Sequence, residues 1–341
     1  MNDVIGKRLI DASDFKLLLG EVSDKCLEAM AQRVASEHVN HFGKAIILYT
    51  PLYLANHCVN QCVYCGYNAK NKIVRHQLSL EDIEKEAIAI SKSGLRHILV
   101  LTGESERDTP LSYIISAVKI LKKYFDSIGI EIYPLNQEDY GKVIEAGVDS
   151  LTIYQEVYNQ DIYKKVHPYG PKSNYDYRLN APERGAKAGM FNLNIGALLG
   201  LGDLKEEVYA LGQHAKYLQD KYPEVNISVS VPRIRPFIGQ TYESEAVEDR
   251  YLVQIILALK LYLPKIGITL STRESKTFRN HMLPLGISKM SAGVMTSVGG
   301  HSDVETGDAQ FDIADTRSVV EIQRDLIRLG YQPVLKDWVD I

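Results

Sequence analysis

Cysteine and tryptophan are scarce in this chain, with four Cys and one Trp among 341 residues. Domains that depend on disulfides carry paired cysteines spread along a short chain. Here Cys58, Cys62 and Cys65 stand together in one short segment, and Cys26 lies apart. This distribution excludes a disulfide framework and favours a metal site at the cluster. Cys26 has no partner motif and is expected to be a core or helix-face thiol.

The chain also lacks an excess of either charge and any long apolar run. It has 39 Lys and Arg against 43 Asp and Glu, a net charge of −4, which predicts no general attraction to nucleic acid or to an anionic membrane. No run approaches the roughly 18 apolar residues that span a bilayer, and the first residues contain no apolar signal core. We expect a globular protein in the cytoplasm.

What the chain does have, from residue 45 onwards, is a regular alternation of short apolar runs with longer amphipathic stretches. This alternation predicts βα units on a parallel sheet, and eight such units make a TIM-type (β/α)8 barrel. The predicted strands are residues 45–54, 97–102, 128–133, 150–154, 192–198, 226–231, 267–271 and 288–291. The predicted helices are residues 79–93, 111–125, 137–146, 177–188, 204–221, 245–263 and 316–329.

No linker rich in Pro, Gly or Ser divides the chain. We therefore predict one barrel domain with extensions at both ends. Residues 1–44 form an N-terminal helical extension, residues 45–305 the barrel, and residues 306–341 a C-terminal closing segment packed on the barrel.

The three clustered cysteines have the spacing C-x3-C-x2-C and directly follow the first predicted strand. They are thus expected on a βα loop at the carboxyl end of the barrel, where barrel enzymes carry out their chemistry. Three thiolates can bind three irons of a [4Fe–4S] cluster and leave the fourth iron open to a small chelating molecule, whereas electron-transfer clusters normally have four Cys ligands. Two alternatives are buried core cysteines, which the polar flanking residues disfavour, and a structural zinc with His57 or Cys26 as fourth ligand, which usually shows paired C-x2-C knuckles.

This cysteine motif, with an aromatic residue just before its last Cys, resembles the signature of the radical S-adenosylmethionine (SAM) enzymes. Further segments, in order along the chain, resemble more narrowly the 2-iminoacetate synthases, the tyrosine lyases of thiamin biosynthesis. These segments are PLYLANHCVNQCVYCGY, VLTGES, YQEVY, GALLGL, SVSVPRIRP, LSTRES, SAG and QPVLKDW. The resemblance extends over nearly the whole chain.

The resemblance implies a carbon–carbon lyase. In such enzymes the reduced cluster passes an electron to SAM, and the resulting 5′-deoxyadenosyl radical takes a hydrogen atom from L-tyrosine. Fission of the Cα–Cβ bond gives 2-iminoacetate (dehydroglycine), for the thiazole moiety of thiamin, and p-cresol. The implied partners are a thiazole synthase, because dehydroglycine hydrolyses in water, and a flavodoxin- or ferredoxin-type reductant.

Relatives in the same subgroup are alternatives. The tyrosine lyase of [FeFe]-hydrogenase maturation carries further cysteines in an extra C-terminal region, and the absence of any cysteine after Cys65 disfavours it. The tryptophan lyase of peptide-antibiotic synthesis and, outside the enzymes, a zinc-stabilised barrel that binds a partner also stay open.

The resemblance places SAM at the ends of successive strands. Tyr64, inside the cysteine loop, is expected to meet the adenine. Thr102, Gly103 and Glu104 stand where the family binds the methionyl amino group; Gly103 permits a close backbone approach and Glu104 can accept from an ammonium. The plainer alternatives are a loop aromatic packed on the barrel rim and an ordinary turn.

Two further residues are expected to complete the SAM site. Glu156 ends the fourth strand and can hold the ribose hydroxyls. Arg178 follows it and can make a forked contact with the methionyl carboxylate. A structural ion pair is the alternative for both.

The substrate site needs a fixed cation for the carboxylate of tyrosine. Arg273 is the best candidate, Ser291 can add a hydroxyl to the same carboxylate, and Tyr53 resembles the subgroup's tyrosine that contacts the bound amino acid. Barrel packing or an internal salt bridge is the alternative for all three.

Four other polar residues have no assigned role in the site. Arg233 and Arg235 are expected to share one side of the sixth strand, with substrate or a structural carboxylate as their partner. His167 and His281 are expected to be ordinary polar residues.

Overall fold

The computed structural model describes residues 2–240, 242–304 and 306–335, so the end of the QPVLKDW segment and of the predicted closing segment lies outside it. Eight parallel strands form a closed barrel in the order β2-β3-β4-β5-β6-β7-β8-β1, and pairing of β1 with β2 closes it. The predicted (β/α)8 barrel is confirmed. The barrel strands are β1 Ala45–Ala55, β2 His97–Thr102, β3 Ser127–Glu131, β4 Ser150–Glu156, β5 Asn192–Ala197, β6 Asn226–Ser230, β7 Gly267–Leu270 and β8 Lys289–Ser291.

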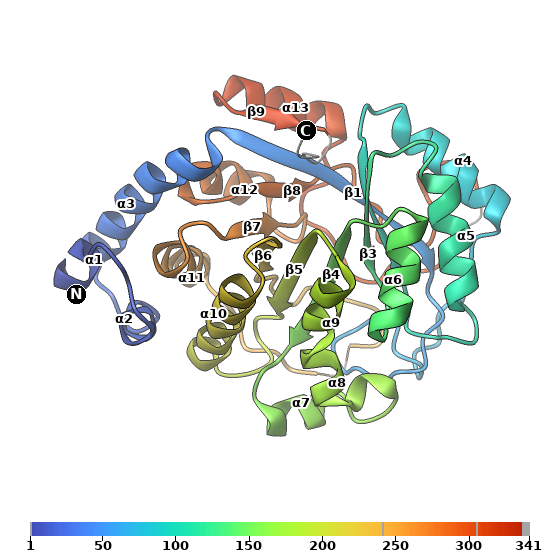
Figure 1. The fold of residues 1–341 in the computed structure, drawn as a ribbon, viewed down its shortest axis with the longest axis horizontal. Helices are drawn as coiled ribbons and strands as arrows, with labels where there is room; N and C mark the ends of the chain where they lie inside the picture. Colours follow the sequence, from blue (N-terminus) through green and yellow to red (C-terminus); the bar gives the residue numbers. More distant parts are fainter. Residues whose placement is uncertain (1, 241, 305, 336–341) are drawn as a thin grey trace.

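The helices surround the strands (Figure 1) and bury their apolar faces against them. Most of these helices begin after a Ser, Asn or Asp. The side chain of this residue accepts a hydrogen bond from one of the first free backbone N–H groups, as Ser79 does before α4. The helices of the barrel are α4 Leu80–Ser91, α5 Leu111–Leu121, α6 Gln137–Ala146, α7 Gln160–Val166, α8 Tyr175–Leu179, α9 Ala181–Ala188, α10 Leu204–Lys221, α11 Asp249–Tyr262 and α12 Lys276–Met282.

Three helices precede the barrel, as predicted, and lie along one side of it (Figure 1): α1 Asn2–Gly6, α2 Ala12–Leu18 and α3 Asp24–Phe42. Helix α3 packs on α11, and α2 packs on both α10 and α11. Phe15 of α2 stacks on Tyr262 with ring centroids 4.6 Å apart. Gly212 of α10 leaves room for this ring, because a Cβ there would collide with it. Cys26 lies on α3 in the apolar core, as expected.

The chain differs from the predicted elements in three places. The helix predicted over 177–188 is two helices, α8 and α9, because Pro182 occupies the first turn of α9, the one helical position that tolerates a missing N–H. Helices α7 and α12 were not predicted, although Asn159 and Ser275 cap them. After α13 Val319–Arg328, the closing segment adds strand β9 Gln332–Val334 to the start of β1. Pro333 is tolerated because β9 is an edge strand.

The barrel interior is unusually polar. Barrels of this type are normally filled by Val, Ile and Leu, whereas a cavity at the amino ends of these strands is lined by Ser150, Thr152, Asn192, Asn194 and Ser228. A second cavity lies at the carboxyl ends of the strands, and most of the chemically reactive side chains line this one. The barrel therefore leaves space for a polar ligand at its carboxyl end.

Among the residues that the structure describes, no helix is long and apolar enough to cross a membrane.

Candidate active site

The cysteine loop follows β1 and is fixed by side-chain contacts to its backbone. Arg75 donates to the carbonyl oxygens of Asn56, Tyr67 and Asn68 at 2.6–2.9 Å. The buried Asn56 side chain bridges to the far end of the loop through Val74 O and His76 N. These contacts satisfy the loop's backbone groups and hold its cysteines in one conformation.

All three cysteines of the loop line the cavity at the carboxyl end of the barrel. They form no disulfide. Burial raises the pKa of the Cys58 thiol to about 11 and also raises the pKa values of Cys62 and Cys65. Neutral thiols of this kind lose their protons when they bind a metal.

No group of three or more His, Cys, Asp or Glu side chains in the described part of the chain gathers closely enough to hold one metal ion. A [4Fe–4S] cluster does not require such a gathering, because each cysteine binds a different iron. Three thiols on one loop, opening into one cavity and without a fourth cysteine beside them, fit the donor set of a cluster with one open iron.

Gly103 brings the second strand's loop against the cysteine loop. Its N–H donates to Ala55 O at 2.8 Å, and a Cβ on it would collide with the carbonyl oxygen of His57. The structure thus shows a close approach of Gly103 to the protein's own backbone, and its expected approach to SAM stays a prediction. The neighbouring Thr102 hydroxyl faces the cavity and is buried without a hydrogen-bond partner among the described residues.

Glu104 and Arg178 form an ion pair at 2.8 Å, and both line the cavity. The second oxygen of Glu104 accepts from Asn60 at 2.8 Å, and Arg178 Nε donates to Tyr154 O at 2.7 Å. Burial alone would lower the pKa of Arg178, but the Glu104 carboxylate together with the nearby Tyr163, Glu156 and Tyr64 outweighs it, and the pKa is raised. The guanidinium therefore stays charged in the cavity wall.

Glu156 ends β4 in a left-handed backbone conformation, with φ of +70°. The pairing of β4 with β5 shifts register here, which is a bulge of the kind that redirects a side chain at a strand end. Its carboxylate pairs with Lys172 Nζ at 2.9 Å. The sequence did not predict Lys172. This residue follows α7 and is far, along the sequence, from the end of any strand.

Tyr64 is held by a neutral histidine. His167 Nδ1 lies 3.0 Å from Tyr163 O, which can only accept, so this nitrogen carries the proton and Nε2 accepts from the Tyr64 hydroxyl at 2.6 Å. Burial lowers the pKa of His167 well below its usual value. Nothing in the sequence indicated this contact, through which His167 fixes a ring in the cavity wall.

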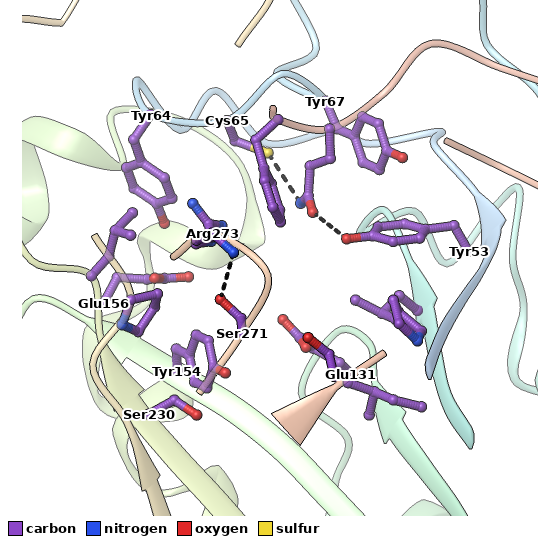
Figure 2. A pocket seen from close by; sticks show the side chains of 18 of the residues that line it. Tyr53, Tyr64, Cys65, Tyr67, Glu131, Tyr154, Glu156, Ser230, Ser271 and Arg273 are labelled. Atoms are coloured by element: carbon purple, nitrogen blue, oxygen red, sulfur yellow. Dashed lines mark hydrogen bonds between the residues drawn. The ribbon is translucent and has the colours of Figure 1, made fainter. Parts of the chain in front are cut away.

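The three residues predicted for the substrate lie in the same cavity. Arg273 follows β7 and stacks over the Phe311 ring at 3.5 Å. Ser291 Oγ accepts from Thr272 N at 3.1 Å, which leaves its own proton to donate. The Tyr53 hydroxyl donates to Gln310 Oε1 at 2.8 Å, and Gln310 Nε2 lies 3.6 Å from Cys65 Sγ. Figure 2 shows this bridge above the cavity.

Arg273 differs from the other arginines near the cavity because no acidic side chain among the described residues pairs with it, whereas Arg178 pairs with Glu104 and Arg233 with Glu274. A half-buried guanidinium that lines a cavity without a carboxylate partner is a ready site for a ligand's anion.

Arg233 and Arg235 do not extend β6, which ends at Ser230, so alternation along a strand does not apply to them. Arg233 binds Glu274 through two nitrogens and Asp249 at 2.8 Å. Its partners are therefore structural carboxylates. Neither arginine lines the cavity.

Several lining residues went unpredicted. Glu131 ends β3 and lay inside a predicted strand, and Lys172 and Gln310 reach the cavity from segments with no motif. One sequence signal could have found Glu131, namely an acidic residue at the end of a strand. This signal indicates Glu131 as much as Glu156.

Comparison with known proteins agrees with this geometry. Residues 52–215 match the Radical SAM superfamily and residues 230–332 the Biotin and Thiamin Synthesis associated domain. The 2-iminoacetate synthase of Salmonella typhimurium is 36% identical over 330 residues, covering 96% of this chain and 88% of that protein. That of Escherichia coli is 36% identical over 326 residues, covering 95% and 86%.

The chain belongs to the 2-iminoacetate synthase family of radical SAM enzymes. Membership in this superfamily implies a [4Fe–4S] cluster and SAM as cofactors. The FeFe-hydrogenase maturase HydG from Carboxydothermus hydrogenoformans has a similar structure, with a TM-score of 0.92 and 32% identity over 98% of this chain and 79% of that one.

Proposed function

We propose that this protein cleaves the Cα–Cβ bond of L-tyrosine to give 2-iminoacetate and p-cresol, and that 2-iminoacetate supplies the thiazole moiety of thiamin. One observation carries the proposal. The cysteine loop and the half-buried Arg273, which has no acidic partner among the described residues, open into one cavity, in a chain 36% identical to two 2-iminoacetate synthases along almost its entire length.

Cys58, Cys62 and Cys65 would hold the [4Fe–4S] cluster. When bound, the cluster and SAM supply the one-electron chemistry of the reaction. The contribution of the chain is to bind, orient and shield the reacting molecules.

The SAM site would use polar atoms that the protein leaves available. Each Glu104 oxygen has one protein partner and retains lone pairs for the methionyl ammonium. Arg178 uses Nε and one terminal nitrogen within the described chain, so the other can donate to the methionyl carboxylate. Thr102, Gly103 and Tyr64 would bind beside them, and Glu156 would accept from the ribose hydroxyls through the oxygen that Lys172 does not occupy.

The substrate carboxylate would bind Arg273 in a forked contact and accept from the Ser291 hydroxyl. The Phe311 ring fixes the guanidinium plane from one side. Tyr53 closes the cavity beside the bound amino acid together with Gln310. A closed cavity excludes water from a product that hydrolyses.

The same chemistry supports two partners. Dehydroglycine must be transferred quickly, and we propose a thiazole synthase as recipient. A flavodoxin- or ferredoxin-type protein would reduce the cluster. We place the reaction in the cytoplasm, where thiols such as the four free cysteines stay reduced.

We also propose that residues 45–305 form the catalytic unit, supported by the helices of residues 1–44 and by the segment from residue 306. Gln310 and Phe311 line the cavity, so the closing segment contributes directly to the site.

The test is a turnover assay of anaerobically reconstituted protein with dithionite, SAM and L-tyrosine. We expect p-cresol, glyoxylate from hydrolysed dehydroglycine, and 5′-deoxyadenosine. The substitution Cys62→Ala should abolish all three, while Cys26→Ala, a buried thiol on α3, should retain them. A Mössbauer spectrum without a cubane, in protein that binds zinc, would overturn the proposal.

The other lyases of the subgroup are separated by their products. Formation of 3-methyl-2-indolic acid from tryptophan would indicate a tryptophan lyase. The similarity to HydG makes the hydrogenase-maturase type the second candidate. Recovery of p-cresol and of glyoxylate from hydrolysed dehydroglycine as the final products favours the 2-iminoacetate synthase activity.

A further inference from the structure

Glu131 is an acidic side chain in the cavity that the proposed function does not use. It ends β3 and lines the cavity together with Glu104, Glu156 and Glu274. Each of those three pairs with a cation, respectively Arg178, Lys172 and Arg233. Within the described residues Glu131 has neither a hydrogen bond nor an ion pair. A half-buried acid that faces a cavity without a donor from the described chain is available to accept a hydrogen bond from a ligand.

The surroundings of Glu131 favour a neutral donor. Burial, with Glu156 nearby, raises the pKa of Glu131 to about 7, although Lys172, Arg178 and Arg273 act in the opposite direction. This space is also lined by Tyr49, Tyr53 and Tyr154. The carboxyl group therefore lies in a cavity where a hydroxyl donor can approach it.

Glu131 and Arg273 lie on opposite walls of the barrel. In the strand order, β3 is four strands from β7 in both directions. Figure 2 shows the two side chains on different sides of the open space between them. A ligand that contacts both must carry an anion at one end and a donor at the other.

L-Tyrosine meets this requirement in one orientation. With its carboxylate on Arg273, its ammonium is two bonds from the carboxylate carbon and stays on that side, whereas its phenol extends across the cavity. Glu104 and Glu156, which lie nearer the cysteine loop side of the site, leave Glu131 as the acid at the far end.

On the basis of the proposed function, we propose that Glu131 accepts a hydrogen bond from the phenolic hydroxyl of bound L-tyrosine and thereby selects tyrosine over phenylalanine. A site built around a hydroxyl rejects the analogue that lacks it, because the site's own polar group is then left unpaired.

The test measures binding of L-tyrosine and L-phenylalanine to the reconstituted protein with SAM, by anaerobic calorimetry. We expect the unsubstituted protein to prefer tyrosine by about 100-fold, a factor typical of a hydrogen bond to a charged group. Glu131→Leu should raise the dissociation constant of tyrosine by about the same factor and leave that of phenylalanine unchanged or lower. Glu131→Gln should give an intermediate preference, since its amide oxygen still accepts.

If Glu131→Leu and Glu131→Gln weaken the binding of tyrosine and phenylalanine equally, the inference is overturned. Glu131 would then contact a part of the substrate that both amino acids share, or support the fold. Glu138→Gln, an exposed acid on α6 paired with Lys142, is the matched control and should leave both constants unchanged. Release of p-cresol by the unsubstituted protein distinguishes failure of this inference from failure of the proposed function. If p-cresol forms while Glu131→Leu keeps its preference for tyrosine, only this inference fails; without p-cresol, the proposed function fails.

Discussion

The hydroxyl of Tyr64 donates to Nε2 of His167 at 2.6 Å, and this bond joins the cysteine loop to the end of α7 across 103 residues. Lys172 lies 5.6 Å from the centre of the same tyrosine ring. The ring proposed to meet the adenine is thus fixed from its edge and from one face before any ligand binds.

Loss of the histidine should therefore weaken SAM binding. His167→Leu leaves the Tyr64 hydroxyl buried without an acceptor, which costs about 1–3 kcal/mol. We expect the KM for SAM to rise about 10-fold with a smaller change in kcat, measured by 5′-deoxyadenosine formation. His281→Gln, on the exposed side of α12, is the control and should change neither value. Equal effects of the two substitutions would show that the bond to Tyr64 does not position the cofactor.

Arg273→Lys should separate cofactor cleavage from lysis. An ammonium cannot reproduce the two parallel hydrogen bonds of a guanidinium or its stacking on Phe311. We expect p-cresol formation to fall about 100-fold, equivalent to about 2.7 kcal/mol, while 5′-deoxyadenosine formation falls only a few-fold. Both products are measured in one assay, with the exposed Arg324→Lys as control. A parallel fall in both products would place Arg273 at SAM and not at the substrate.

Gly103→Ala should displace the cysteine loop, because the new Cβ would collide with the His57 carbonyl, which is backbone and cannot rotate away. We expect a loss of about 2 kcal/mol or more in stability and a lower iron content after reconstitution. Gly141→Ala is the matched control, since a Cβ there meets nothing within 4 Å. Removing a glycine from the interior of α6 should stabilise the protein by about 0.5–1 kcal/mol. Full iron content in Gly103→Ala would contradict the expected displacement.

Asp315 should stabilise the closing segment at neutral pH. Its carboxylate, almost fully buried, pairs with Arg279 and Arg317, each at 2.5 Å. Burial acts to raise the pKa of Asp315, but the arginines outweigh it and the pKa lies below 3.8. A depressed pKa means that the stabilisation is present above the unfolded value, near 4, and is lost as pH falls through the folded value.

Asp315→Asn should accordingly lower stability by about 3 kcal/mol at pH 7, because it leaves the buried Arg279 guanidinium without a carboxylate and leaves Arg317 with Asp325 alone. Thermal unfolding of the apoprotein between pH 7 and pH 3 would measure this. We expect the difference in melting temperature to shrink at the acid end. A difference independent of pH would mean that the charge of Asp315 contributes nothing.

The barrel strands could be predicted because each is a short apolar run followed by an amphipathic helix, and this pattern is local. The cysteines, Glu104, Glu156 and Arg273 could be placed in one site for the same reason, since each follows a strand and all such ends meet on one face. Their expected roles at SAM and at the substrate came in addition from the resemblance to the radical SAM enzymes.

The unpredicted parts depend on contacts distant in sequence. Gln310 contacts Tyr53, which is 257 residues away in the sequence. Lys172 contacts Glu156 from the segment after α7. Neither Gln310 nor Lys172 stands in a sequence motif that would indicate its contact. Strand β9 contains a proline, which argues against a strand unless the neighbour on one side is known to be missing. A structural ion pair was the alternative to a ligand role for Glu156 and Arg178, and both do form one, with the partners Lys172 and Glu104 that the sequence did not indicate.

The bridge from Tyr53 through Gln310 to Cys65 has a consequence for biosynthesis of the protein. A ribosome delivers the cysteine loop some 240 residues before Gln310. The nascent barrel thus presents its three clustered thiols without the side chain that bridges Tyr53 and Cys65 until Gln310 has been synthesised. Cluster assembly machinery has its widest access during that interval, before Gln310 and Phe311 take their places in the cavity wall.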